Sequence, residues 1–165
     1  MTQPRTARPG GGPTAAPGPA GPPRIPVRPF PVAVDADYAD FFGGLVRRQL
    51  TVRQCTACGT VQWPPRLLCS RCRGDMFRPV SIGDRGVVHT FTVCHRAYDP
   101  WFASRVPYAV AVADLGAGIR LAGSYLGDDL DALCCGLPVR AQYVVDGAHA
   151  TVGWAPTGAA PGSRP

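Results

Sequence analysis

Apolar side chains near residue 40 recur with the period of an α-helix. Six of them occupy positions i, i+3, i+4, i+7, i+8 and i+12: Tyr38, Phe41, Phe42, Leu45, Val46 and Leu50. This spacing predicts a helix over residues 38–50, with Asp35 or Asp37 as its N-cap. Two glycines inside it each cost about 1 kcal/mol relative to Ala. The helix therefore needs a surface to pack on, either its own domain or a partner.

From residue 79 onward the pattern is typical of β-structure. Short apolar runs at 86–96, 106–115, 119–126, 139–145 and 150–154 predict five strands, with glycines at the corners between them. Asp146-Gly147 predicts a hairpin between the last two strands. On the first strand, strict alternation places Val88, Thr90, Thr92 and Cys94 on one face. We therefore expect a small barrel over residues 79–156.

The two ends of the chain differ from this patterned part. Residues 1–34 hold ten Pro, five Gly and almost no aromatic side chains, which predicts a disordered, partly polyproline arm. A docking arm for a partner is the alternative. Residues 157–165 form a similar predicted tail. These ends also carry most of the charge excess.

The positions of the charged residues along the chain decide what the net charge of +6 indicates. Four of the 17 Arg lie in residues 1–34 and one is Arg164, which leaves 12 Arg against 11 Asp in the patterned part. A protein that follows a phosphate backbone needs its cations on the folded surface. Nucleic acid is therefore not the expected partner. Neither a secretory leader nor a membrane span is apparent in the hydropathy pattern, so we expect a cytoplasmic protein with reduced thiols.

Four of the seven cysteines form two pairs with metal-binding spacing. Cys55 and Cys58 are followed by Gly59, Cys69 and Cys72 by Arg73-Gly74, and ten residues separate the pairs. We expect the glycine after each pair to turn the chain away through a positive φ. Two such turns supply four thiolates to one tetrahedral Zn²⁺. Two disulfides, four buried thiols and an iron site are the alternatives. A shell of four Cys leaves no open coordination position, so the expected zinc is structural.

Three further cysteines, Cys94, Cys134 and Cys135, are expected to be small buried apolar residues. His95 follows Cys94 directly, but neighbours on a strand point to opposite faces, so we do not expect a catalytic pair there. His89 and His149 have ordinary strand positions. We find no Ser/His/Asp order, carboxylate pair or phosphate loop, so no catalytic residues are predicted.

An ordered set of motifs over about residues 36–156 resembles a known family. The family joins an N-terminal helix, a rubredoxin-like zinc ribbon and a C-terminal five-stranded OB-fold, and is catalogued as domain of unknown function thirty-five. The motifs are FFGGL at 41–45, CTACG at 55–59, WPPR at 63–66, CSRC at 69–72, GVVHTFTV at 86–93, PYAVAV at 107–112 and GLPV at 136–139. The resemblance implies a mainly β protein with a helix at 35–50, a zinc ribbon at 51–78 and an OB-fold at 79–156.

The resemblance also implies a function. Members of the family are non-catalytic accessory subunits that bind thiolase-like (ketosynthase-like) enzymes, acyl-CoA hydratases or aldolases, and the OB domain helps complete the partner's acyl-CoA channel. By analogy, the helix (Phe41, Phe42 and Leu45) and the ribbon are the expected partner-docking elements. A single-stranded nucleic-acid binder is the alternative function, since zinc ribbons and OB-folds also serve that role.

The loop at residues 97–106 is the expected contact with CoA or the acyl chain in this resemblance. It carries four candidate residues: Tyr98, Trp101, Phe102 and Arg105. An Arg can pair with CoA phosphates, and aromatic rings can stack on adenine or cover an apolar tail. The alternative is that the aromatic residues close the end of the barrel and Arg105 is solvated.

Overall fold

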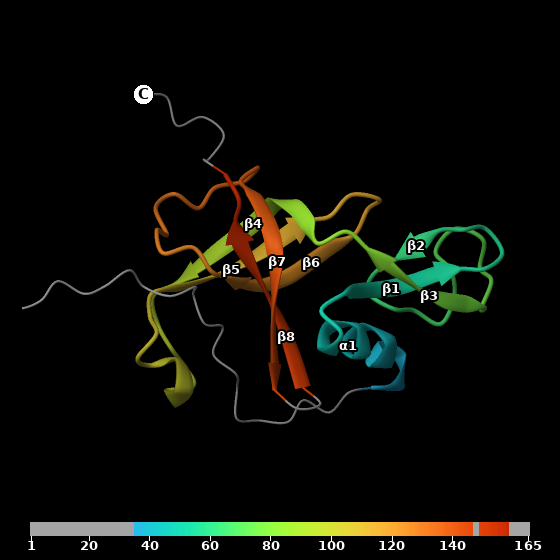
Figure 1. Cartoon of the computed structure of the whole chain (residues 1–165), viewed down its shortest axis with the longest axis horizontal. Coiled ribbons are helices and arrows are strands. Elements are labelled where there is room, and N and C mark those ends of the chain that lie inside the picture. Colours follow the sequence, from blue (N-terminus) through green and yellow to red (C-terminus); the bar gives the residue numbers. More distant parts are fainter. Residues whose placement is uncertain (1–34, 147–148, 159–165) are drawn as a thin grey trace, which may run out of the picture.

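Two β-sheets, one helix and the connections between them make up the part of the chain that the computed structural model describes, residues 35–146 and 149–158 (Figure 1). The first sheet has the order β2-β1-β3, and its strands are β1 (Leu50–Cys55), β2 (Val61–Gln62) and β3 (Phe77–Ile82). The second is a closed barrel of order β4-β5-β6-β8-β7. Its strands are β4 (Arg85–Cys94), β5 (Tyr108–Asp114), β6 (Arg120–Tyr125), β7 (Pro138–Asp146) and β8 (His149–Pro156).

The barrel confirms the five predicted strands and the mainly β fold. All its neighbouring pairs are antiparallel except β6 and β8, which are parallel. Trp154 on β8 is fully buried inside, and its Nε1–H donates to the backbone oxygen of Leu121 at 3.2 Å. The pairing of β7 with β8 extends to Asp146 and His149, so the predicted hairpin is present, although Gly147 lies outside the described residues.

The helix is shorter than predicted. A 3-10 turn, η1 (Ala36–Tyr38), is capped by the Asp35 carboxylate and leads into α1 (Ala39–Val46). The chain then reverses at Arg48, which has a positive φ of 60°. The prediction that Leu50 belongs to the helical face was therefore wrong: Leu50 begins β1. It fitted the helical period because both elements bury side chains in one core.

The helix packs on its own chain, between the two sheets (Figure 1). It contacts β1 on one side and β7 and β8 on the other. Phe41 and Leu45 are buried, and Phe42 packs partly against the same core. Gly44 lets α1 approach β1 closely, because a Cβ at this position would meet the Thr51 side chain. The helix thus covers its own domain, and docking of a partner through it stays a prediction.

The alternation predicted for β4 breaks at His89. The pairing with β5 joins Val88 to Ala113 and then Thr90 to Val112, so His89 is the extra residue of a β-bulge. Val88 is buried before the bulge, and Phe91 and Val93 pack on the core after it. The prediction that Thr90, Thr92 and Cys94 share a face with Val88 was therefore wrong, since one inserted residue reverses the phase of a strand.

The predicted arm at residues 1–34 and most of the predicted tail, residues 159–165, lie outside the described part of the chain. The predicted boundary between residues 78 and 79 falls within β3, whose pairing with β1 continues to Ile82 opposite Leu50. The two sheets are therefore joined directly by the short turn between β3 and β4.

Candidate metal centre and neighbouring surfaces

The first cysteine pair sits at the end of β1. Cys55 is the last residue of that strand, and its carbonyl accepts the N–H of Gly59 at 2.9 Å, which closes the turn. Gly59 has a φ of 73°, a conformation that favours glycine. Thr56 N–H donates to the Met76 carbonyl at 3.0 Å, so this turn is fastened to the segment that follows the second pair.

The second pair forms the same kind of turn without glycine at the corresponding position. Arg73 N–H donates to the Cys69 carbonyl at 3.0 Å, and Arg73 itself takes the positive φ, 67°. The glycine expected to make this turn is Gly74, one residue later, whose carbonyl instead accepts from Cys69 N–H at 2.8 Å. The buried Gln62 on β2 accepts from Ser70 N–H at 3.2 Å and positions the turn against the sheet.

These two turns bring all four predicted ligands together. The Sγ atoms of Cys55, Cys58, Cys69 and Cys72 lie within 4.8 Å of one another. The Cys55–Cys72 and Cys58–Cys69 sulfur distances are 3.5 and 3.6 Å. Zinc–sulfur bonds of about 2.3 Å in a tetrahedron place the sulfurs about 3.8 Å apart, so the cluster fits Zn²⁺ with little adjustment.

The pKa values of the four thiols in the absence of metal also favour a bound cation. The hydrogen bonds from Thr60 lower the pKa of Cys58 to about 6, and the backbone N–H groups of Cys72 and Arg71 lower that of Cys69. Although the Gly74 backbone lowers it, the pKa of Cys72 is raised to about 12 by the neighbouring sulfurs of Cys58 and Cys55. Four thiolates at this spacing need a cation among them. The centre therefore holds one structural zinc.

The other three cysteines lie elsewhere. Cys94 and Cys134 are half-buried, and Cys134 packs against the core. Cys135 is exposed, so its predicted burial was wrong. The turn Cys134–Leu137 directs Leu133 and Leu137 inward, which leaves Cys135 on the outside.

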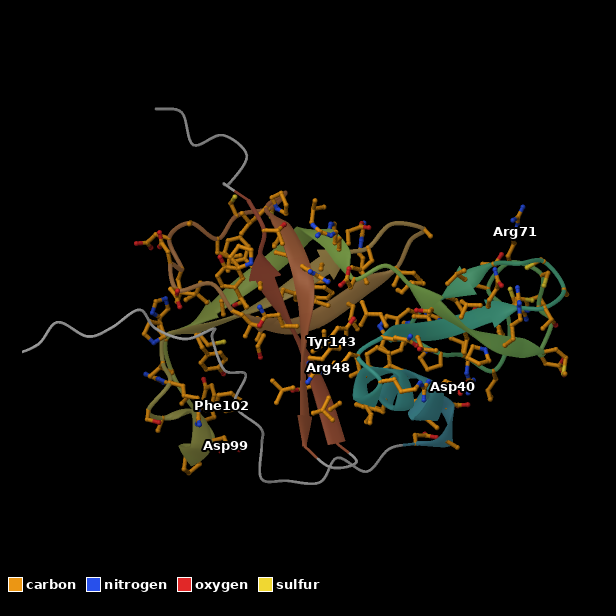
Figure 2. All side chains as sticks on the ribbon, viewed as in Figure 1. Asp40, Arg48, Arg71, Asp99, Phe102 and Tyr143 are labelled. Carbon is orange, nitrogen blue, oxygen red and sulfur yellow. The ribbon has the colours of Figure 1, made fainter. Side chains whose placement is uncertain are left out.

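The loop at residues 97–106 forms a short 3-10 turn, η2 (Pro100–Phe102), at the end of the molecule opposite the zinc ribbon. Figure 2 shows Asp99 and Phe102 at this end and Arg71 at the other. The Phe102 ring stacks on Tyr108 at the start of β5, with centroids 4.9 Å apart. Tyr98 is 92% exposed and Arg105 is half-buried. Phe102 thus anchors the loop, whereas Tyr98 lies on its surface; the Trp101 side chain lies outside the described part.

A cleft of about 610 Å³ lies beside the two ends of this loop. Its walls include His95, Tyr108 and Tyr125, and three aspartates, at positions 128, 129 and 131, form its rim. No motif in the sequence predicted this cleft. The run Asp128-Asp129-Leu130-Asp131 was visible in the sequence, but only the barrel brings it to the strand ends that complete the cleft.

The fold and the four-sulfur centre define a protein that joins a zinc ribbon to an OB-fold. Residues 42–78 match the family model described as ChsH2, rubredoxin-like zinc ribbon domain, and residues 79–144 match ChsH2, C-terminal OB-fold domain. A DUF35 domain-containing scaffold protein of Methanothermobacter thermautotrophicus is 30% identical over 98 residues, which cover 59% of this chain and 73% of the relative. The chain belongs to the ChsH2/DUF35 family, which confirms the resemblance inferred from the motifs.

Two further relatives carry functional names. A probable enoyl-CoA hydratase alpha subunit of Thermomonospora curvata is 33% identical over 118 residues, 72% of this chain. The chain spans 36% of the length of that subunit. A chain of the solved Ltp2-ChsH2(DUF35) aldolase is 28% identical, with a TM-score of 0.70 over 76% of this chain and 98% of the other. The homologues thus include a probable enoyl-CoA hydratase alpha subunit, a chain of an aldolase and a DUF35 domain-containing scaffold protein.

In the described part of the chain, no helix has the length and apolar character needed to cross a membrane.

Proposed function

We propose that this chain is a non-catalytic accessory subunit that binds a hydratase, aldolase or thiolase-like enzyme and completes its acyl-CoA site. The observation that carries the proposal is the likeness to the Ltp2-ChsH2(DUF35) aldolase chain, which extends over 98% of that chain. The hydratase subunit of Thermomonospora curvata supports the same class of partner. Because this chain matches nearly the whole length of that aldolase chain, we infer that it contributes contact surfaces to an enzyme complex. The described part of this chain offers two such surfaces.

The first surface is the tip of the zinc ribbon. Leu67, Leu68 and Met76 are 78, 45 and 67% exposed, and they flank the second cysteine turn. Three exposed apolar side chains on one small ribbon favour a protein interface there. The zinc holds the turns that present them, so its role is to make this surface rigid. We infer that the ribbon tip docks the partner.

The second surface is the loop at residues 97–106. The exposed Tyr98 ring can stack on an adenine or cover an acyl chain, and the Arg105 guanidinium can pair with a phosphate. The neighbouring cleft has an acidic rim, which repels phosphates. The CoA nucleotide is therefore expected on the Arg105 side of the loop, with the cleft left to another ligand.

No catalytic role is assigned to this chain. Within residues 35–146 and 149–158, the only cluster able to hold a metal is the closed set of four cysteines. His89 and His95 are exposed, and no hydrogen bond joins either of them to a carboxylate in the same part of the chain. Activity is accordingly expected from the partner, with this chain lowering the KM for the acyl-CoA substrate.

Co-expression with a hydratase, aldolase or thiolase-like enzyme of the same organism tests docking. We expect a stable complex by size-exclusion chromatography. Leu67→Ser and Met76→Ser should each weaken it by about tenfold or more, since interface anchors commonly contribute over 1 kcal/mol. Val87→Ser is the matched control, because Val87 is 43% exposed but lies on the barrel. A chain that stays free in the presence of this enzyme would contradict the proposal.

Steady-state kinetics of the assembled complex test the second surface separately. Tyr98→Ala and Arg105→Gln should raise the KM for acyl-CoA while the complex still forms. Tyr38→Ala, in η1 where the Tyr38 ring contacts Trp63 of the ribbon, serves as a control that should leave this KM unchanged. Unchanged KM values for both loop variants would remove the loop from the substrate site without affecting the docking claim.

A further inference from the structure

The charges of the folded part are distributed unevenly between the ribbon and the barrel. Residues 47–82, which form the ribbon and the turn before it, hold seven Arg and one Asp, whereas residues 83–158, which include the barrel, hold five Arg and seven Asp. A zinc ion bound by four thiolates has a net charge of about −2, so seven Arg, one Asp and the zinc centre leave the loaded ribbon at about +4. The near-neutral total therefore hides a basic ribbon and an acidic barrel.

Three exposed arginines, named here the arginine tip, lie around the apolar side chains at the end of the ribbon. Arg66 directly precedes Leu67 and Leu68, and Arg71 and Arg73 belong to the second cysteine turn. The three guanidinium groups form no ion pair and no side-chain hydrogen bond with any residue in the described ranges. Their charge is therefore unbalanced within this part of the chain.

Arg73 takes a backbone conformation that favours glycine. Its φ is 67°, close to the 73° of Gly59, which has the same place in the first cysteine turn. A side chain at such a φ is strained relative to glycine. No described residue pairs with the Arg73 guanidinium, so the fold alone gives no reason for an arginine here. A group that binds this guanidinium from outside the described residues supplies that reason.

The zinc centre does not account for the arginine tip. A guanidinium can stabilise an anionic metal cluster by donating to a cysteine sulfur, but among the described residues the side-chain contacts of these sulfurs are with one another and with Thr60. Figure 2 shows the Arg71 side chain extending outward from the ribbon, at the end of the molecule far from the barrel. The arginine tip thus forms part of the outer surface rather than of the metal site.

We propose that the arginine tip binds carboxylates on the docking face of the partner enzyme. This inference rests on the proposed function and specifies the chemistry of that face: aspartate or glutamate side chains around an apolar patch that receives Leu67, Leu68 and Met76. A guanidinium pairs with a carboxylate through two parallel N–H···O bonds, which fixes the orientation of the ribbon. Because an acidic face attracts the basic ribbon and repels the acidic barrel, the ribbon end approaches the partner first.

The composition of the tip suits a protein better than a nucleic acid. A single strand is held by a basic groove together with exposed aromatic rings on which its bases stack. The exposed apolar side chains at the tip, Leu67, Leu68 and Met76, are aliphatic. The ribbon residue Trp63 instead packs on Phe41, with ring centroids 4.3 Å apart. Arginine and methionine side chains, which the tip does offer, are enriched at protein interfaces.

Glycine substitutions at two arginines with positive φ test the contact. The probe is the hydratase, aldolase or thiolase-like enzyme that forms a complex in the docking experiment. Arg73→Gly removes the guanidinium and relieves the strain, so its zinc content and unfolding midpoint should equal or exceed those of the parent. Arg48→Gly is the matched control, because Arg48 has a φ of 60° but lies in the turn between α1 and β1, far from Arg71 (Figure 2).

The affinity for the enzyme is the readout. We expect Arg73→Gly and Arg71→Gln each to raise the Kd by about fivefold or more, and Arg48→Gly to change it by less than about twofold. The association rate of the parent should fall by about tenfold or more between low and high salt, because salt screens the attraction between the ribbon and an acidic face.

Cross-linking identifies the carboxylates directly. The chain contains no Lys, so Arg71→Lys introduces a side-chain amine at the tip and keeps the charge. With a carbodiimide, this amine forms an amide bond with an Asp or Glu of the enzyme within reach, the lost water converts the reagent to a urea, and mass spectrometry locates the joined residues. Arg48→Lys supplies the same amine at the control position and should give no such product.

The outcomes separate this inference from the proposed function. A cross-link from Arg71→Lys, with weaker binding of Arg73→Gly, supports the carboxylate contact. A complex whose affinity is unchanged in Arg73→Gly and Arg71→Gln overturns the contact and leaves the accessory role intact. Tight binding of a single-stranded RNA oligonucleotide that Arg73→Gly abolishes also overturns it, because the tip would then bind phosphates. A chain that binds none of the three enzyme classes contradicts both the contact and the proposed function.

Discussion

Replacing Leu45 by Ala tests whether the helix is part of the folded core. Leu45 is 1% exposed and lies on α1, which packs on β1 of the ribbon and on β7 and β8 of the barrel. The substitution removes the isopropyl group from a site enclosed on all sides. The Leu45 side chain lies on the helix that joins the ribbon to the barrel, so its loss should affect the stability of the whole chain.

The magnitude follows from burial. Removing the isopropyl group at about 0.8 kcal/mol per buried carbon costs roughly 2.4 kcal/mol, and a partly relaxed cavity adds about 1 kcal/mol. The better helix propensity of Ala returns only a few tenths of a kcal/mol. We expect a loss of about 3 kcal/mol in the free energy of unfolding. With a urea m-value of about 1.5 kcal/mol/M, the unfolding midpoint falls by about 2 M.

Urea unfolding in zinc-containing buffer, followed by far-UV circular dichroism and by tryptophan fluorescence, measures this loss. Val46→Ala is the matched control, because Val46 is the next residue of α1 and is 36% exposed. There the smaller burial loss is offset by the higher helix propensity of Ala, so the change should stay within about 0.5 kcal/mol. If Leu45→Ala costs no more than Val46→Ala, the helix does not pack as described.

Three further predictions concern the ribbon and the barrel. Metal analysis should find one zinc per chain, and Cys69→Ser should release it at chelator concentrations that leave the parent loaded; a metal-free chain with two disulfides would contradict the zinc centre. Gly59→Ala should cost about 1 kcal/mol in urea unfolding because φ is 73° there, whereas Gly74→Ala, with only ordinary contacts around a Cβ, should cost much less. The Gly116 N–H and then the Arg120 guanidinium lower the pKa of Asp114 from its usual 3.8. The stability difference between the parent and Asp114→Asn should therefore be complete above pH 3.8 and vanish as the pH falls through the lower folded-state pKa. A stability difference that grows on acidification would contradict the lowered pKa.

The zinc centre was the most predictable feature. Its ligands come in two local turns, and the spacing of Cys55 and Cys58 is sufficient to place both sulfurs on one ion whatever the rest of the chain does. The turn conformations were less predictable. A positive φ at Gly59 was expected, but in the second turn Arg73 takes that conformation, because the hydrogen bonds of the turn outweigh the small cost of a side chain there.

The sequence by itself determined the class of fold, because apolar periodicity and paired cysteines are local properties that survive in any packing. It therefore specified a helix, a metal-bound ribbon and five barrel strands in the right order. Only the tertiary structure decided where α1 ends and that Leu50 belongs to β1, since both segments contribute to one core and periodicity alone does not divide them. The bulge at His89 and the cleft beside the loop at residues 97–106 also depend on contacts between distant strands. Those contacts, rather than the motifs, determine which side chains remain on the surface for a partner or a ligand.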